Sequence, residues 1–145
     1  MGRGESSPLA VSPETAPDAA TIRAIADGLE AYNRRFAPQA DWTPRWFVGR
    51  DSNGAVQAGL RYVLAYEWAF VHWLWVAEPY RRQGVGSELL CRAEDDARQN
   101  ACRGVYLDTF SFQAPEFYQR RGYREFGRID DFPRGHSQIW LAKRF

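Results

Sequence analysis

Cysteine and histidine are both scarce in this 145-residue sequence, which contains two of each. Cys91 and Cys102 lie on or beside one predicted helix, about 16 Å apart at 1.5 Å per residue, which is too far for a disulfide. We therefore expect two small buried hydrophobic residues in a reduced, cytoplasmic protein. Two histidines without a Cys/His cluster argue against a metal site.

Long apolar runs and a strong net charge are also absent. No apolar run approaches the ~18 residues of a membrane span, and the N-terminus lacks the apolar core of a signal peptide. The formal net charge is +1, which gives no reason to expect nucleic acid or an anionic membrane as a partner. The sequence therefore predicts an ordinary globular protein.

The length fits one domain that buries roughly 68–70% of the surface of its unfolded chain. Residues 1–17 are rich in Gly, Ser, Pro and Ala, so we expect a mobile tail there. Within this tail, Leu9-Ala10-Val11 is compatible with a short edge strand. Residues 18–145 are expected to form the single domain.

The most informative stretch is Tyr80-Arg81-Arg82-Gln83-Gly84-Val85-Gly86-Ser87. The apolar run 70–76 before it predicts a buried strand, and apolar residues recurring every four positions after it predict a helix. Glycines at a helix N-terminus let a ligand approach backbone amides that have no intrahelical partner. The two arginines add donors suited to phosphate oxygens. The pattern therefore predicts an anion site, most simply for a pyrophosphate.

Two other glycine motifs do not fit this stretch. The P-loop requires a lysine after its second glycine, and Ser87 stands at that position. The dinucleotide fingerprint requires a third glycine where this chain has Leu89. A plain strand-to-helix turn with two solvated arginines stays open as the structural alternative.

The order of predicted elements indicates an α+β protein with a mixed sheet. A helical crossover between strands 69–76 and 105–109 makes that pair parallel. Asn53-Gly54 predicts a hairpin turn, and Gly104 is expected to cap the crossover helix. The predicted helices are 22–36, 84–102 and 114–121, and the predicted strands are 46–49, 56–66, 69–76, 105–109, 123–129 and 137–143.

Two motifs resemble the signatures of the GNAT superfamily of N-acetyltransferases. Arg81-Arg82-Gln83-Gly84-Val85-Gly86 is similar to its acyl-coenzyme A loop, and Ala114-Pro115-Glu116-Phe117-Tyr118-Gln119-Arg120-Arg121-Gly122-Tyr123 to its second signature. The resemblance implies a small, single-domain member of bacterial type. It also implies the GNAT fold, a mostly antiparallel sheet with flanking helices in which the parallel strands 71–76 and 105–109 splay apart.

By this resemblance, acetyl-CoA is the acyl donor. Tyr118 corresponds to the tyrosine that protonates the departing thiolate, and a backbone amide near Leu74 to the group that polarises the thioester carbonyl. Ser111 stands where the family often has asparagine. The implied cofactor-binding residues are Leu74, Trp75, Val76, Arg81, Arg82, Gln83, Gly84, Val85, Gly86, Ser87, Ser111, Ala114, Phe117 and Tyr118.

The general base and the acceptor site are less well marked. A glutamate that some members use is replaced by Phe70, whereas His72 matches a catalytic histidine of arylalkylamine acetyltransferases. A histidine in an apolar strand is more often a core residue. Trp73 and Trp75 share one face of their strand, where core packing is favoured over an acceptor wall. Competing base and substrate positions are Asn33, Glu67, Asp108, Asp131 and His136.

The sequence thus predicts transfer of an acetyl group from acetyl-CoA to a primary amine by direct attack in a ternary complex. The acceptor is expected to be a small molecule rather than a protein. A non-catalytic acyl-CoA sensor of the same fold is the alternative. Exposed sheet edges also allow a homodimer.

Overall fold

The computed structural model describes residues 9–145. The chain divides into two units, one that ends at Gln39 and one that runs from Ala40 to Phe145. Residues 9–11 form no strand, so the edge strand that the sequence allowed there is not found. Among the helices of residues 9–145, none has the length and apolarity needed to cross a bilayer.

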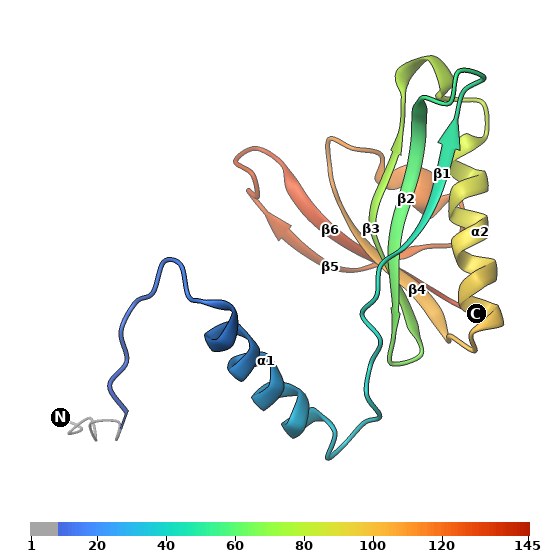
Figure 1. Cartoon of the computed structure of the whole chain (residues 1–145). Helices are drawn as coiled ribbons and strands as arrows, with labels where there is room; N and C mark the ends of the chain where they lie inside the picture. The colour runs from blue at the N-terminus through green and yellow to red at the C-terminus, as the bar shows by residue number, and fades with distance from the viewer. Residues whose placement is uncertain (1–8) are drawn as a thin grey trace. The chain divides into compact units, whose positions relative to one another are not determined.

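Residues 9–39, the described part of the first unit, contain one helix, α1 (Ala19–Asn33) (Figure 1). It begins after Asp18, whose carboxylate accepts a hydrogen bond from the Thr21 amide at 2.7 Å. This N-cap satisfies one of the free amides of the first turn. The side chains of Tyr32 and Phe36 then pack with ring centroids 5.5 Å apart at the end of the helix.

The second unit is built on a six-stranded sheet with strand order β1-β2-β3-β4-β6-β5. Every neighbouring pair is antiparallel except β3 and β4, which confirms the predicted mixed α+β sheet. The elements are β1 (Arg45–Arg50), β2 (Val56–Ala65), β3 (Trp68–Val76), the 3-10 helix η1 (Glu78–Tyr80), α2 (Val85–Gln99), β4 (Gly104–Phe110), α3 (Pro115–Gln119), β5 (Arg124–Asp130) and β6 (Ser137–Arg144).

The parallel strands β3 and β4 pair only along part of their length. Ala69 to Val71 pair with Val105 to Leu107, and the strands diverge beyond these residues. In Figure 1, β1, β2 and β3 accordingly run in a different direction from β5 and β6. The structure thus confirms the expected splay, which leaves an opening in the sheet beyond Val71 and Leu107.

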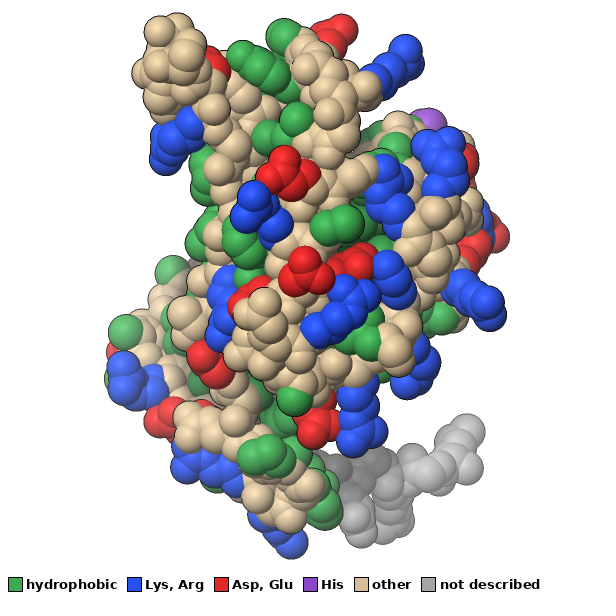
Figure 2. Space-filling model, turned by 90° about the vertical axis from the view of Figure 1, so that its right-hand side faces the viewer, with side chains coloured by type: hydrophobic (Ala, Val, Ile, Leu, Met, Phe, Trp, Pro, Cys, Tyr) green, Lys and Arg blue, Asp and Glu red, His purple; other side chains and the backbone are tan. Residues whose placement is uncertain are grey.

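Helix α2 packs on one face of the sheet and supplies much of the core. Leu89, Leu90, Ala93 and Ala97 are buried in one cluster with residues of β2, β3 and β4. The apolar spacing read from the sequence is therefore the buried face of this helix. Its outer face carries mixed charge, and acidic and basic side chains are interspersed on the side shown in Figure 2.

Two details of the α2 region differ from the sequence predictions. Asn100, not Gly104, is the C-cap of α2, and Ala101 takes the left-handed conformation (φ 58°). Gly104 instead begins β4, where a Cβ would lie 2.4 Å from the Lys143 carbonyl oxygen. Cys102 is buried as expected, but Cys91 is exposed because it lies on the outer face of α2; both thiols are free.

Candidate active site

The second unit contains a cleft of about 1060 Å³ beside the opening between β3 and β4. Its lining joins the glycine turn at one end to the splayed strands and α3 at the other. The lining residues are Val71, His72, Trp73, Leu74, Trp75, Val76, Tyr80, Arg81, Arg82, Gly84, Val85, Gly86, Ser87, Leu107, Asp108, Thr109, Phe112, Gln113, Ala114, Phe117, Tyr118, Arg120 and Arg121.

The glycine turn presents the N-terminus of α2 to the cleft. Gly84 is the N-cap residue and has a φ of 83°, a left-handed conformation that glycine adopts without steric cost. The first backbone bond of the helix joins the Glu88 amide to the Gly84 carbonyl at 2.9 Å. The amides of Val85, Gly86 and Ser87 therefore have no intrahelical partner and carry the positive end of the helix dipole. All three residues line the cleft, so the geometry suits an anion.

Arginines surround this helix end. Arg81 is held by a 2.9 Å hydrogen bond from its Nε to the Val76 carbonyl, and Arg82 has a left-handed φ of 61°. Arg121 donates to the Phe117 carbonyl at 2.6 Å and to the Ser87 hydroxyl, with its guanidinium 3.7 Å from the Phe117 ring centroid. Arg121 therefore fastens α3 to the glycine turn and adds fixed charge to the cradle.

The lining contains residues that the sequence reading did not assign to the site. Arg120, Arg121, Phe112, Gln113 and Tyr80 all line the cleft. The arginines stand inside the second motif, and their charge was the available signal for an anion site. Phe112 and Gln113 carried no such signal, because only the course of the chain after β4 brings them to the cleft.

The free edge of β3 faces the opening. The Ala77 amide donates to the Gln57 carbonyl at 2.7 Å, so residue 77 directs its backbone groups toward β2. Because these groups alternate along a strand, those of Leu74 and Val76 point the other way, toward β4. The Val76 carbonyl accepts from Arg81, whereas the amides of Leu74 and Val76 are both free donors beside the opening, because the pairing with β4 ends at Val71.

Tyr118 projects from α3 into the same cleft. Its ring lies between those of Phe117 and Tyr123, with centroid distances of 5.0 and 5.9 Å. Burial, and secondarily the negative charge of Asp108, raises the pKa of Tyr118 to about 12. The phenol is therefore neutral at pH 7 and carries a proton that it can donate.

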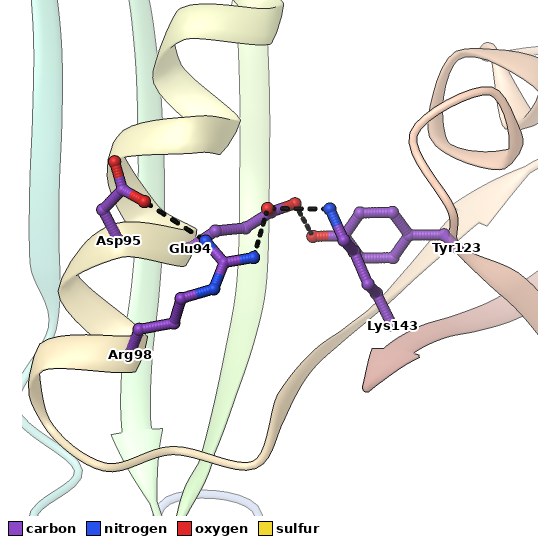
Figure 3. A network of polar contacts seen from close by, with 5 residues as sticks. All are labelled: Glu94, Asp95, Arg98, Tyr123 and Lys143. Carbon is purple, nitrogen blue, oxygen red and sulfur yellow. Dashed lines mark hydrogen bonds and ion pairs between the residues drawn. The ribbon is translucent and has the colours of Figure 1, made fainter. Parts of the chain in front are cut away.

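A buried polar network supports Tyr118 from behind (Figure 3). Glu94 on α2 is 4% exposed and accepts from the Tyr123 hydroxyl at 3.0 Å and from the Lys143 ammonium at 2.9 Å. Arg98 lies 3.5 Å from the same carboxylate and also pairs with Asp95. Burial and the Glu94 carboxylate raise the pKa of Tyr123. This network fixes the ring against which Tyr118 packs.

A β-bulge changes the alternation of side chains in β3 at His72. Arg61 pairs with Trp73 and Tyr62 pairs with Val71, so His72 is the extra residue. The imidazole lines the cleft and lies edge-on to Phe70 at 4.3 Å. A bulge next to a cleft re-aims side chains into it.

The two tryptophans of this strand are not core residues, contrary to the packing expected from the sequence. Trp73 is 62% and Trp75 50% exposed, and both line the cleft. The core face of β3 is occupied by Leu74 and Val76, which pack against the buried cluster. Alternation therefore directs both indoles to the face away from α2.

Of the predicted substrate positions, Asp108 lies in the cleft lining. One of its carboxylate oxygens accepts from the Gln138 amide at 2.8 Å. His136 does not line the cleft. Its ring packs edge-on, with centroids 4.9 Å apart, against Phe112, which does line the cleft. The structure thus brings Asp108 to the same cleft as His72 and Tyr118.

The other positions predicted from the sequence have local partners. The Ser111 hydroxyl accepts from the Ser137 amide, and Gln83 donates to the Pro79 carbonyl; neither residue lines the cleft. Glu67 forms an ion pair with Arg103, and Asp131 accepts from the Gly135 amide within its turn. Asn33 ends α1 in the first unit, and its role stays a prediction.

Comparisons with known proteins give a consistent result. A family model described as Acetyltransferase (GNAT) family matches residues 14–123. Acetyltransferase Atu2258 of Agrobacterium fabrum is 36% identical over 128 residues, covering 88% of this chain and 93% of that protein. Blasticidin-S acetyltransferase of Streptomyces morookaense is 42% identical over 91 residues, covering 62% and 67%. The crystal structure of an acetyltransferase from Bacillus cereus superposes with a TM-score of 0.81 at 32% identity, covering 92% and 98%.

Proposed function

Because this chain belongs to the GNAT family of acetyltransferases, we propose that it moves an acetyl group from acetyl-CoA to a primary amine of a small molecule. The observation that carries the proposal is one continuous cleft that joins the anion cradle of α2 to the splayed strands and Tyr118. Such a cleft can hold donor and acceptor together. Neither Cys91 nor Cys102 lines it, which favours direct attack in a ternary complex over a covalent route through cysteine.

The residues present fit the acyl donor in charge and shape. The pyrophosphate would bind the α2 amides from Val85 to Ser87, with Arg82 and Arg121 as nearby cations. At Gly86 a Cβ would already lie 3.4 Å from the Phe117 ring, so larger residues would fill the cradle. We assign to the free amide of Leu74 the role of stabilising negative charge on the thioester carbonyl oxygen. In other enzymes, one such donor lowers the activation barrier by roughly 2.7–4 kcal/mol.

We assign the proton donor to Tyr118. Its pKa of about 12 lies above the ordinary thiol value near 8.5, so proton transfer to a free thiolate would be uphill by roughly 5 kcal/mol. This gap is wider than ordinary tyrosine and thiol values would give. An ammonium bound beside Asp108 would offset the part of the shift that this carboxylate causes.

His72 is the proposed general base. An imidazole has an ordinary pKa near 6.5, which suits a base that works at neutral pH, whereas a carboxylate is much the weaker base. Asp108 is already bonded to Gln138 and is better suited to hold the ammonium by charge. The name of blasticidin-S acetyltransferase identifies a small-molecule acceptor for that relative, which supports an acceptor of this size here.

The test is release of the coenzyme A thiol across a panel of amines, with Tyr118→Phe and the control Tyr66→Phe. Tyr66 lies in the β2–β3 turn and does not line the cleft. We expect amine-dependent release that falls by about 10²–10⁴ in Tyr118→Phe, as for other lost general acids, and is unchanged in the control. Acetyl-CoA binding without release for any amine would favour the sensor alternative. Equal release by the two variants would remove Tyr118 from its role.

A further inference from the structure

Three exposed aromatic rings from two segments of the chain line the cleft. Trp73 and Trp75 come from β3, and both indoles are at least half exposed. Phe112, which follows β4, also lines the cleft and is 55% exposed. Large apolar rings normally become buried unless a ligand or partner covers them, so three of them in one cleft require an explanation.

Two of these rings, Trp73 and Phe112, are held in place by neighbouring side chains. The Trp46 ring meets Trp73 edge-on at 5.7 Å, and the Arg61 guanidinium lies 5.2 Å from the Trp73 centroid. Phe112 stacks on Phe110 at 5.2 Å with an angle of 4° between the rings, and His136 packs edge-on against it. Rings fixed in this way lose little freedom when a ligand packs against them.

The charged side chains in and near the cleft would orient a bound amine. Arg61 is a fixed cation behind Trp73, whereas Asp108 is the anionic side chain in the cleft lining. An ammonium is repelled from the first and attracted to the second. Asp108 also lies near Tyr118, since its charge acts on the phenol, so an amine held there is close to the proposed acid.

Resting on the acetyltransferase function proposed above, we infer that the acceptor is an alkylamine that carries a planar aromatic or heteroaromatic ring. The ring packs against Trp73 and Phe112, and the amino group is directed to Asp108. A saturated ring of similar size fills the same volume but lacks the flat π face that stacks on indole and phenyl rings. The site therefore distinguishes aromatic from saturated amines of equal charge and length.

The experiment compares 2-phenylethylamine with 2-cyclohexylethylamine, which differ only in the ring. Two quantities are measured, the dissociation constant in the presence of coenzyme A by calorimetry, and kcat/KM with acetyl-CoA by thiol release. We expect the aromatic amine to be favoured by at least about 2- to 13-fold in both, the fold-change that corresponds to 0.5–1.5 kcal/mol for a single aromatic pair. Trp73→Leu and Phe112→Leu should each reduce this preference.

Two exposed rings outside the cleft provide matched controls. Trp42 is 58% and Phe126 62% exposed, and neither lines the cleft, so Trp42→Leu and Phe126→Leu should keep the preference. Equal binding of the two amines, binding of neither, or an unchanged preference in both cleft variants overturns the inference. Selective binding of the aromatic amine without thiol release would support the site and refute the transferase function. Efficient acetylation of saturated amines alone would support the transferase function and refute the aromatic site.

Discussion

Replacing Lys143 by methionine should lower the free energy of unfolding by about 2–3 kcal/mol, because it removes a cation from a buried carboxylate. Glu94 is 4% exposed, and its three partners are the Lys143 ammonium, the Tyr123 hydroxyl and the more distant Arg98. Methionine keeps most of the aliphatic stem of lysine, so little packing is lost. The effect therefore reports mainly on charge.

The magnitude follows from the exposure of the partners. Removing one member of a buried ion pair costs about 3–5 kcal/mol when the other is left uncompensated. The Lys143 side chain keeps 25% of its exposure, and Arg98 stays 3.5 Å from the carboxylate, so the loss should fall at or just below the lower end of this range, at about 2–3 kcal/mol. Arg98→Met is the matched control: with 45% of its side chain exposed, it should cost no more than about 1 kcal/mol.

The assay is urea unfolding followed by tryptophan fluorescence at pH 7. A second variant, Glu94→Gln combined with Lys143→Met, removes both charges and keeps an amide oxygen for the Tyr123 hydroxyl. We expect it to be more stable than Lys143→Met alone, because no buried charge is left unpaired. If the double variant instead shows the sum of the two single losses, burial of unpaired charge is not the cause and the reasoning is refuted.

Three further outcomes are expected. Gly104→Ala should destabilise the fold by about 1–3 kcal/mol in urea unfolding, since its Cβ would overlap the Lys143 carbonyl, whereas Gly127→Ala has no contact closer than 3.8 Å and should change stability far less. Gly86→Val should raise the dissociation constant for coenzyme A by about tenfold or more in calorimetry, because the side chain fills the cradle. The raised pKa of Tyr118 makes the folded state hold this proton more tightly than the unfolded chain. The stability that this gives is complete below pH 10 and is lost between pH 10 and 12. Because the pKa values of Tyr62 and Tyr123 are also raised, the test is the comparison with Tyr118→Phe, whose urea midpoint should fall less than that of the unmodified protein from pH 8 to 11.

Local patterns were sufficient to predict most of the fold of the second unit. The four-residue spacing identified the buried face of α2, and Asn53-Gly54 marked the β1–β2 turn, where Gly54 has a φ of 82°. The crossover through α2 required β3 and β4 to be parallel, as they are. These features depend on residues close together in the sequence, which is why the sequence reveals them.

The errors occurred where distant residues decide the structure. Gly104 was read as a helix cap, but β6 passes so close to it that a side chain would collide with the Lys143 carbonyl. No local pattern contains the position of the neighbouring strand. Cys91 is a different case: it was expected to be buried, yet it lies on the solvent side of α2, and the four-residue spacing of Leu89, Ala93 and Ala97 already places it off the buried face.

The candidate site likewise has one part that a short stretch of sequence predicts and another that depends on distant segments. Its anion cradle lies in one short stretch, so glycines and arginines alone predict it. The residues of the proposed acceptor site come from β3 and from the segment after β4, and the bulge at His72 interrupts the simple alternation of side chains. Trp73 and Trp75 were therefore placed correctly on one face but assigned wrongly to the core.

Strand β3 explains why these parts meet in one place. One of its faces buries Leu74 and Val76 against the core, and the opposite face presents Trp73 and Trp75. Its edge beyond Val71 has no partner strand, so backbone amides are free where a thioester could lie. A strand paired along its whole length would have closed this edge. In the proposed function, the splay of β3 and β4 is thus the feature that lets one strand contact the donor and the acceptor together.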